Sequence, residues 1–195
     1  MENFKVVIVE DVPLEMKGTL GIIRNDIPEA EVIGTASNET EYWKVLKQNL
    51  PDLVLFDLGL GGSTTIEALE YKPDIDFVIS DCAFEDVESA LKQNFATMHV
   101  PDFLIPLANT AIRLLYGYSI YDIRPIDALD DNTVPIFFIQ GDADKSVPPK
   151  SAQDLYDRAS GVRELHYIAG AGHAESILVS PQEYRTYVES FLSNI

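Results

Sequence analysis

Hydrophobic positions along the chain form short continuous runs that alternate with longer amphipathic segments. Six runs rich in valine, isoleucine and phenylalanine predict strands, at residues 5–10, 30–36, 52–58, 76–81, 134–141 and 164–170. Between and after them, hydrophobic residues recur every three or four positions, which predicts helices at 13–25, 38–49, 62–71, 85–94, 150–160 and 181–193. Strands that are apolar on both faces and separated by helices are typical of a parallel sheet covered on both sides.

This alternation predicts an α/β protein built on one doubly wound, all-parallel sheet of six strands. Right-handed crossovers favour the strand order 2-1-3-4-5-6 with helices on both faces, which gives three layers, α/β/α. Residues 95–133 interrupt the alternation with several prolines and a helical apolar stretch at 102–116, and so long a connection is typically functional or a lid. No repeat or flexible linker marks a boundary, so residues 1–195 are expected to form a single domain.

The charge of the chain restricts its partners. Asp and Glu number 32 against 14 Lys and Arg, which gives a net charge of −18 with the acids spread along the chain. Such a surface repels nucleic acid and anionic membranes, so neither is expected as a partner. The longest apolar stretch, "FLIPLANTAIRLLY", is too short to cross a bilayer and contains Arg113. The segment 102–116 is instead a candidate homodimer contact.

Cysteine usage and the first residues indicate the compartment. Cys82 is the single cysteine, so an internal disulfide is excluded, and its place after the run "FVISD" predicts a packing role. The amino-terminal residues "MENFKVVIVED" lack the basic start of a secretion signal. A cytoplasmic location is therefore expected.

Acidic residues follow two of the predicted strands. Glu10 and Asp11 end the first strand, and Asp57 lies near the end of the third. Because the carboxyl ends of adjacent parallel strands converge, the three carboxylates should repel one another unless a hard cation such as Mg²⁺ neutralises them. The pattern predicts a weak Mg²⁺ site at which Asp57 could accept a phosphoryl group. The alternative is that Glu10 and Asp11 only cap a helix.

The same stretches carry a family resemblance. "KVVIVEDVPL", "EVIGTASNETE" and "PDLVLFDLGL" resemble the flavodoxin-like receiver domain of bacterial response regulators, over residues 1–60. The resemblance implies that Asp57 is the phospho-acceptor of a phosphorelay. Beyond residue 60, Ser80 supplies the hydroxyl residue that ends the fourth receiver strand, but Gln140 replaces the lysine that ends the fifth. That replacement argues against switching by phosphorylation.

The remainder of the chain resembles a different family. "LGGSTTIEAL", "VPIFFIQGDADKSVPP" and "YIAGAGHAES" resemble the carboxyl-terminal half of an α/β-hydrolase, over residues 61–195, with 95–133 as a cap-like insertion. The resemblance implies that Asp144 is the acid and His173 the base of a catalytic triad. Their order along the chain agrees with that of this fold.

The nucleophile of such a triad is missing from its expected position. In the pattern G-x-S-x-G the serine falls on Gly59, because the chain reads D-L-G-L-G there. Without a hydroxyl, acyl transfer by that route is lost. Ser63 lies about one helical turn further on, at ~1.5 Å per residue, and is expected to point elsewhere.

Two family halves in one chain lead to a functional expectation. Both families share a strand–loop–helix unit at residues 57–69, so one half could be joined to the other there without breaking the sheet. The expected function is therefore an engineered, recombined scaffold without efficient activity, in which Asp144, His173 and Asp57 are remnants. Two alternatives stay open: a Mg²⁺-binding, phospho-accepting receiver module, and a weak serine-hydrolase-like esterase.

Overall fold

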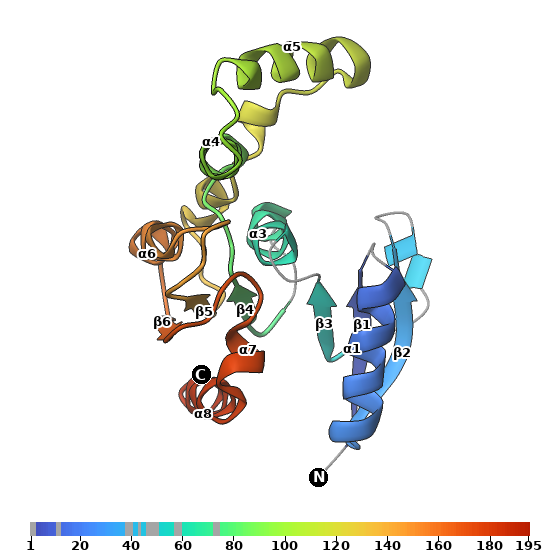
Figure 1. The fold of residues 1–195 in the computed structure, drawn as a ribbon. Helices are drawn as coiled ribbons and strands as arrows, with labels where there is room; N and C mark the ends of the chain where they lie inside the picture. Colours follow the sequence, from blue (N-terminus) through green and yellow to red (C-terminus); the bar gives the residue numbers. More distant parts are fainter. Residues whose placement is uncertain are drawn as a thin grey trace. The chain divides into compact units, whose positions relative to one another are not determined.

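The computed structural model describes residues 3–10, 13–37, 41–42, 44–45, 51–56, 60–71 and 75–195. Asp11, Asp57 and Gly59, which carry several of the expectations above, lie outside the described residues. The chain divides into two compact units, Met1–Asp57 and Leu58–Ile195 (Figure 1). Each unit is described by itself below.

The first unit is a three-stranded parallel sheet with a helix on it. Its elements are β1 (Phe4–Val9), α1 (Pro13–Asp26), β2 (Ala30–Ala36) and β3 (Leu53–Phe56), and the strand order is β2-β1-β3. Because side chains alternate along a strand, Val6 and Ile8 of β1 share a face, and they pack in one core cluster with Ile23 of α1. Residues 41–42 and 44–45 are helical, within the helix predicted at 38–49.

The second unit contains the other three strands and most of the helices. Its strands are β4 (Val78–Asp81), β5 (Ile136–Gly141) and β6 (Arg163–Ile168), in the order β4-β5-β6 and parallel. Its α-helices are α3 (Leu60–Glu67), α4 (Val87–Thr97), α5 (Leu104–Tyr116), α6 (Pro149–Arg158), α7 (Ser176–Val179) and α8 (Pro181–Leu192). Its 3₁₀ helices are η1 (Ala68–Tyr71), η2 (Ile120–Asp122) and η3 (Pro125–Leu129).

The central strand β5 is buried along its whole length. Ile136 and Phe138 belong to a core cluster that includes residues of α3 and α6, whereas Phe137 and Ile139 pack with Phe191 of α8. Figure 1 shows α3 and α6 on one face of this sheet and α8 on the other. Coverage of both faces explains why β5 reads as a continuous apolar run in the sequence.

The prediction of one six-stranded sheet is wrong in its pairing. The strands are parallel, but they hydrogen-bond in two sets of three, β2-β1-β3 and β4-β5-β6, and the predicted order holds within each set. Hydrophobic periodicity identifies a strand and its buried faces, yet it does not specify which strand lies beside it.

The segment that interrupts the alternation contains the predicted helix. α5 begins at Leu104 and ends before Gly117, whose positive φ of 82° is the left-handed conformation that commonly follows a helix. Leu114, Leu115 and Tyr116 at its end are all more than two-thirds exposed. In the described part of the chain, no helix is both long and apolar enough to span a membrane. The homodimer contact at 102–116 stays a prediction.

Candidate functional site

Asp144 and His173 form a hydrogen-bonded pair. Asp144 lies in the loop after β5 and His173 in the loop after β6, and these parallel neighbours bring both loops to the same edge of the sheet. His173 Nδ1 lies 2.8 Å from Asp144 Oδ2. The Asp144 side chain is fully buried and that of His173 is 33% exposed. Nδ1 of the imidazole is therefore held by a carboxylate, while part of the ring is accessible to solvent.

The surroundings of Asp144 hold its carboxyl group in the charged form. Oδ1 accepts hydrogen bonds from the backbone N–H groups of Ser146 (2.8 Å) and Val147 (2.9 Å), and Oδ2 accepts one from Gln140 Nε2 (2.9 Å). Burial by itself raises the pKa of Asp144, but the hydrogen bonds from His173 and Val147 outweigh it and leave the pKa below its ordinary value. Because a carboxylate only accepts hydrogen bonds, Nδ1 of His173 donates and Nε2 is the basic nitrogen.

Gln140 has a structural role that was not predicted from the sequence. The receiver resemblance treats it as a lost lysine, whereas the structure places it fully buried beside Asp144, with Nε2 also 3.1 Å from the carbonyl oxygen of Val147. It therefore fixes both the acid and the loop that follows. The sequence did contain a signal for this role. Gln140 is a polar residue inside the apolar run "IFFIQGD", four positions before Asp144.

The end of β4 is attached to the loop that carries His173. Ser176 donates a hydrogen bond to Asp81 Oδ1 (3.4 Å), and the backbone N–H of Ala174 donates to Cys82 Sγ (3.4 Å). The thiol of Cys82 in turn donates to Asp81 Oδ1 (3.1 Å). Burial raises the pKa of Asp81, although these hydrogen bonds act in the opposite direction. β4 thus provides a buried polar anchor for the histidine loop.

Cys82 itself is a packing residue, as its position after the buried run predicts. Its side chain is fully buried, and burial together with the charge of Asp81 raises the pKa of the thiol far above its ordinary value. The thiolate is the nucleophilic form of cysteine, so a thiol held protonated in this way is inert.

Three of these residues carry possible ligand atoms that lie close enough together to hold a metal ion. Ligand atoms of Cys82, Asp144 and His173 all lie within 4.8 Å of one another, the only such group among the described residues, and they are donors that zinc accepts. However, both oxygens of Asp144 already accept two hydrogen bonds each, and Cys82 retains its proton. Hydrogen bonding therefore explains why these atoms lie together.

The predicted Mg²⁺ site is described only in part. Glu10 follows β1, is buried, and donates its backbone N–H to the carbonyl oxygen of Ala36 (2.9 Å). Asp11 and Asp57 lie outside the described residues. Mg²⁺ binding by Glu10, Asp11 and Asp57 stays a prediction.

The two serines considered from the sequence are bound to nearby backbone. Ser63 Oγ accepts a hydrogen bond from the N–H of Phe84 (2.9 Å) and lies 3.3 Å from its carbonyl oxygen. Ser80 Oγ donates to the carbonyl oxygen of Gly62 (3.4 Å). Both hydroxyls are buried and join α3 to β4 and the loop after it, which is a structural use.

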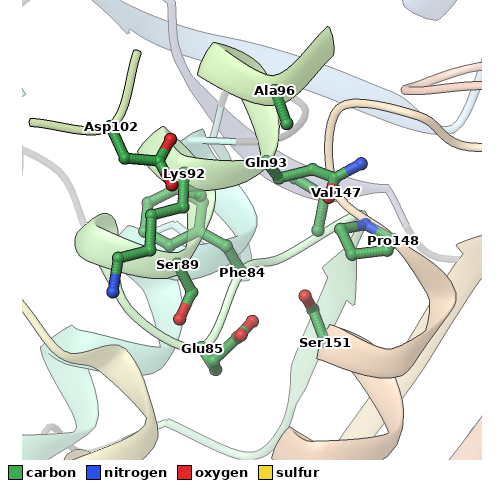
Figure 2. Close-up of a pocket in the computed structure, with 11 residues that line it drawn as sticks. Phe84, Glu85, Ser89, Lys92, Gln93, Ala96, Asp102, Val147, Pro148 and Ser151 are labelled. Atoms are coloured by element: carbon green, nitrogen blue, oxygen red, sulfur yellow. The ribbon is translucent and has the colours of Figure 1, made fainter.

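A cavity lies between α4 and the start of α6. Its volume is about 400 Å³, and it is lined by Phe84, Glu85, Ser89, Ala90, Lys92, Gln93, Ala96, Asp102, Val147, Pro148 and Ser151 (Figure 2). Val147 connects it to the acid, because its N–H binds Asp144 while the residue lines the cavity. Gln93 of α4 also donates to the carbonyl oxygen of Lys145 in the same loop (3.1 Å). The cavity wall is thus continuous with the loop that positions Asp144.

Replacing Gly141 with alanine is expected to displace the loop that carries His173. A Cβ atom there would lie 2.3 Å from the carbonyl oxygen of Ala171 and 2.7 Å from that of Gly172, and these backbone atoms directly precede His173. The loop must move, so we expect a loss of about 1–3 kcal/mol in the free energy of unfolding, as for other overpacked cores. Denaturant unfolding measures it, with Gly21→Ala as the control, because a Cβ atom there meets no atom within 4 Å and Gly21 has no positive φ. A Gly141→Ala variant as stable as the unmodified protein would contradict this packing.

The sequence is similar to that of one curated protein, although it matches no family model. An uncharacterized protein of Bacillus subtilis, YqkD, is 30% identical over 122 residues, which are 62% of this chain and 40% of that protein. The chain thus matches less than half the length of this curated relative.

Solved structures similar to the chain include esterases and a lipase. The Pyrococcus furiosus esterase Pf2001 matches 99% of this chain and 81% of its own, with a TM-score of 0.67 and 16% identity. A Paleococcus ferrophilus monoacylglycerol lipase matches 98% of this chain and 95% of its own, with a TM-score of 0.66 and 16% identity. The esterase domain of a Rhodothermus marinus protein matches 98% and 86%, with a TM-score of 0.61 and 12% identity.

These matches correct the functional expectation. The similarity does not stop near residue 60, because single esterase structures match almost the whole chain, and the interpretation as an inactive recombined scaffold is therefore wrong. A sheet that starts with strand order 2-1-3 can belong to a receiver or to a hydrolase, so short motifs in the first 60 residues could not distinguish the two. The chain has an α/β fold with parallel sheets that is similar to the α/β-hydrolase fold.

Proposed function

We propose that this protein is an ester hydrolase in which His173 and Asp144 transfer protons. The observation that carries the proposal is the 2.8 Å contact between His173 Nδ1 and a buried Asp144 whose pKa lies below its ordinary value. A carboxylate held charged in this position stabilises the imidazolium that forms when the histidine takes a proton. The structural similarity to esterases supports the same class of reaction.

A water molecule is the proposed nucleophile. Gly59, at the position that the hydrolase pattern assigns to serine, has no side-chain hydroxyl to form an acyl-enzyme. In the proposed reaction, Nε2 of His173 accepts a proton from water as the water oxygen attacks the ester carbonyl carbon. The bond to the alcohol oxygen then breaks, and the imidazolium returns the proton to the leaving alkoxide. The products are a carboxylic acid and an alcohol, and the enzyme returns to its starting state.

The cavity beside Asp144 supplies the substrate class. Its apolar side chains suit a hydrocarbon portion of an ester, and its volume falls in the range of about 300–1,000 Å³ of small-molecule sites. We therefore propose esters small enough to enter this cavity, rather than polymers, as substrates.

Hydrolysis by water makes a kinetic prediction. With p-nitrophenyl butyrate, the unmodified protein is expected to release p-nitrophenol linearly from the first turnover, without a burst, because no acyl-enzyme accumulates. Intact-mass spectrometry during turnover should show the unmodified mass only. A burst, or a mass increase of one butyryl group, would identify a protein nucleophile and contradict the water step. Turnover no faster than the buffer blank would contradict the proposed function as a whole.

A further inference from the structure

The cavity between α4 and α6 contains a carboxylate with one buried oxygen that accepts no hydrogen bond from any residue that the structure describes. Glu85 lines this cavity, and its Oε2 atom is buried with no hydrogen-bond partner among the described residues. Leaving a carboxylate oxygen buried and unpaired costs free energy that a donor in the cavity would recover. Ser151 also lines the cavity, is 3% exposed, and its hydroxyl makes no hydrogen bond within residues 75–195. Figure 2 shows the oxygen atoms of both side chains on the cavity side.

The nearby lysines form their ion pairs with other acids, although the pKa of Lys150 is raised by its hydrogen bond to Asp154 and also by the charge of Glu85. Lys92 forms an ion pair with Glu88 (2.6 Å), and Lys150 forms one with Asp154. No ion pair of Glu85 is formed within the described part of the chain. Asp102, a second acid, and Lys92 also line the cavity, so its lining carries two acidic side chains and one basic side chain. The charge facing the cavity is therefore negative, in a protein whose net charge of −18 already attracts cations.

The remaining lining is suited to an apolar group. Phe84, Ala90, Ala96, Val147 and Pro148 surround the polar pair with hydrocarbon surface. A ligand that satisfies both parts has an apolar body and a group that donates several hydrogen bonds and carries positive charge. A primary ammonium group fits this description, because its three N–H bonds can reach Glu85 and Ser151 together.

We propose that this cavity selects molecules that carry a primary ammonium group, with Glu85 as the residue that recognises it. The inference rests on the proposed ester hydrolysis for the role of the ligand as a substrate. Val147 places the two sites next to each other, since it lines the cavity and binds Asp144 through its N–H (2.9 Å). The preferred substrates are then esters whose acyl or alcohol part ends in an ammonium group.

Binding of a matched pair of probes tests the selectivity without any turnover. 2-Phenylethylamine, charged at pH 7, and 2-phenylethanol differ chiefly in that charge, and calorimetry gives a Kd for each. We expect the amine to bind about tenfold more tightly, the ratio for a charge-assisted hydrogen bond that replaces a neutral one. Glu85→Gln should remove this preference, whereas Glu70→Gln, the same charge change on an exposed residue outside the cavity lining, should retain it. Equal Kd values for the two probes, or a preference that survives in Glu85→Gln, would overturn the proposal.

A second measurement separates this inference from the proposed function. The p-nitrophenyl esters of 6-aminohexanoate and heptanoate are close in size and differ in the ammonium group, which replaces a methyl group. We expect a higher kcat/KM for the amino ester in the unmodified protein and in Glu70→Gln, but not in Glu85→Gln. Hydrolysis of both esters at equal rates overturns the inference and leaves the esterase proposal standing. Selective binding of the amine without hydrolysis of either ester overturns the esterase proposal and leaves the binding site standing.

Discussion

Replacing His173 with alanine is expected to lower kcat/KM for p-nitrophenyl butyrate by about 100- to 10,000-fold, the contribution of a positioned general base. The histidine is the proton acceptor of the proposed reaction, and its Nδ1 is fixed at 2.8 Å from the charged, buried Asp144. The variant loses the base, so water must attack unassisted. Initial rates over a range of ester concentrations give the change in kcat and KM separately, and the loss should appear in kcat.

Two further variants sharpen this result. Asp144→Asn keeps the side-chain volume but replaces a carboxylate that accepts four hydrogen bonds with a group that also donates, so activity and melting temperature should both fall. His99→Asn is the matched control, because His99 is an exposed residue at a positive φ of 57°, a conformation that asparagine tolerates. Unchanged activity in a folded His173→Ala variant would remove the pair from the reaction.

Much of the second unit could be predicted from the sequence, because its signals are local. The uninterrupted apolar run of β5 identified a strand buried on both faces, and Phe137 and Phe138 do point to opposite core clusters. The final helix, α8, was expected at 181–193 and spans Pro181–Leu192. Pairing between strands is a different matter, since it depends on contacts between distant residues. The six strands and the order within each set of three were therefore predicted, whereas their union in one sheet was wrong.

The candidate site was also predicted only in part from the sequence. Asp144 and His173 follow consecutive strands of the sequence, and neighbouring parallel strands bring such residues to one edge. Gln140 acts locally, four positions before Asp144, but its role was not predicted. The anchors Asp81 and Cys82 were not predicted either, because they act through contacts with residues up to 95 positions away. Glu85 and Ser151 were missed for the same reason. Each has an ordinary sequence context, and only the packing of α4 beside α6 brings them to one cavity.

Replacing Gly59 with serine is expected to raise kcat/KM for p-nitrophenyl butyrate by about 100-fold or more and to introduce a burst of p-nitrophenol. The hydrolase pattern places the nucleophile at this position, where the sequence has no hydroxyl. A serine there would give His173 a hydroxyl to deprotonate, and the acyl-enzyme route would replace direct attack by water. Intact-mass spectrometry should then detect a butyrylated protein during turnover.

Gly59→Ala is the control for the serine variant, because it adds the same Cβ atom without the oxygen. Any gain that comes from backbone rigidity or altered packing would appear in both variants, whereas a gain from nucleophilic catalysis appears only with serine. Combining Gly59→Ser with His173→Ala should abolish the burst, since the hydroxyl then has no base. Equal rates for the serine and alanine variants, with no acylated protein, would show that the nucleophile position of the hydrolase pattern does not fall on residue 59.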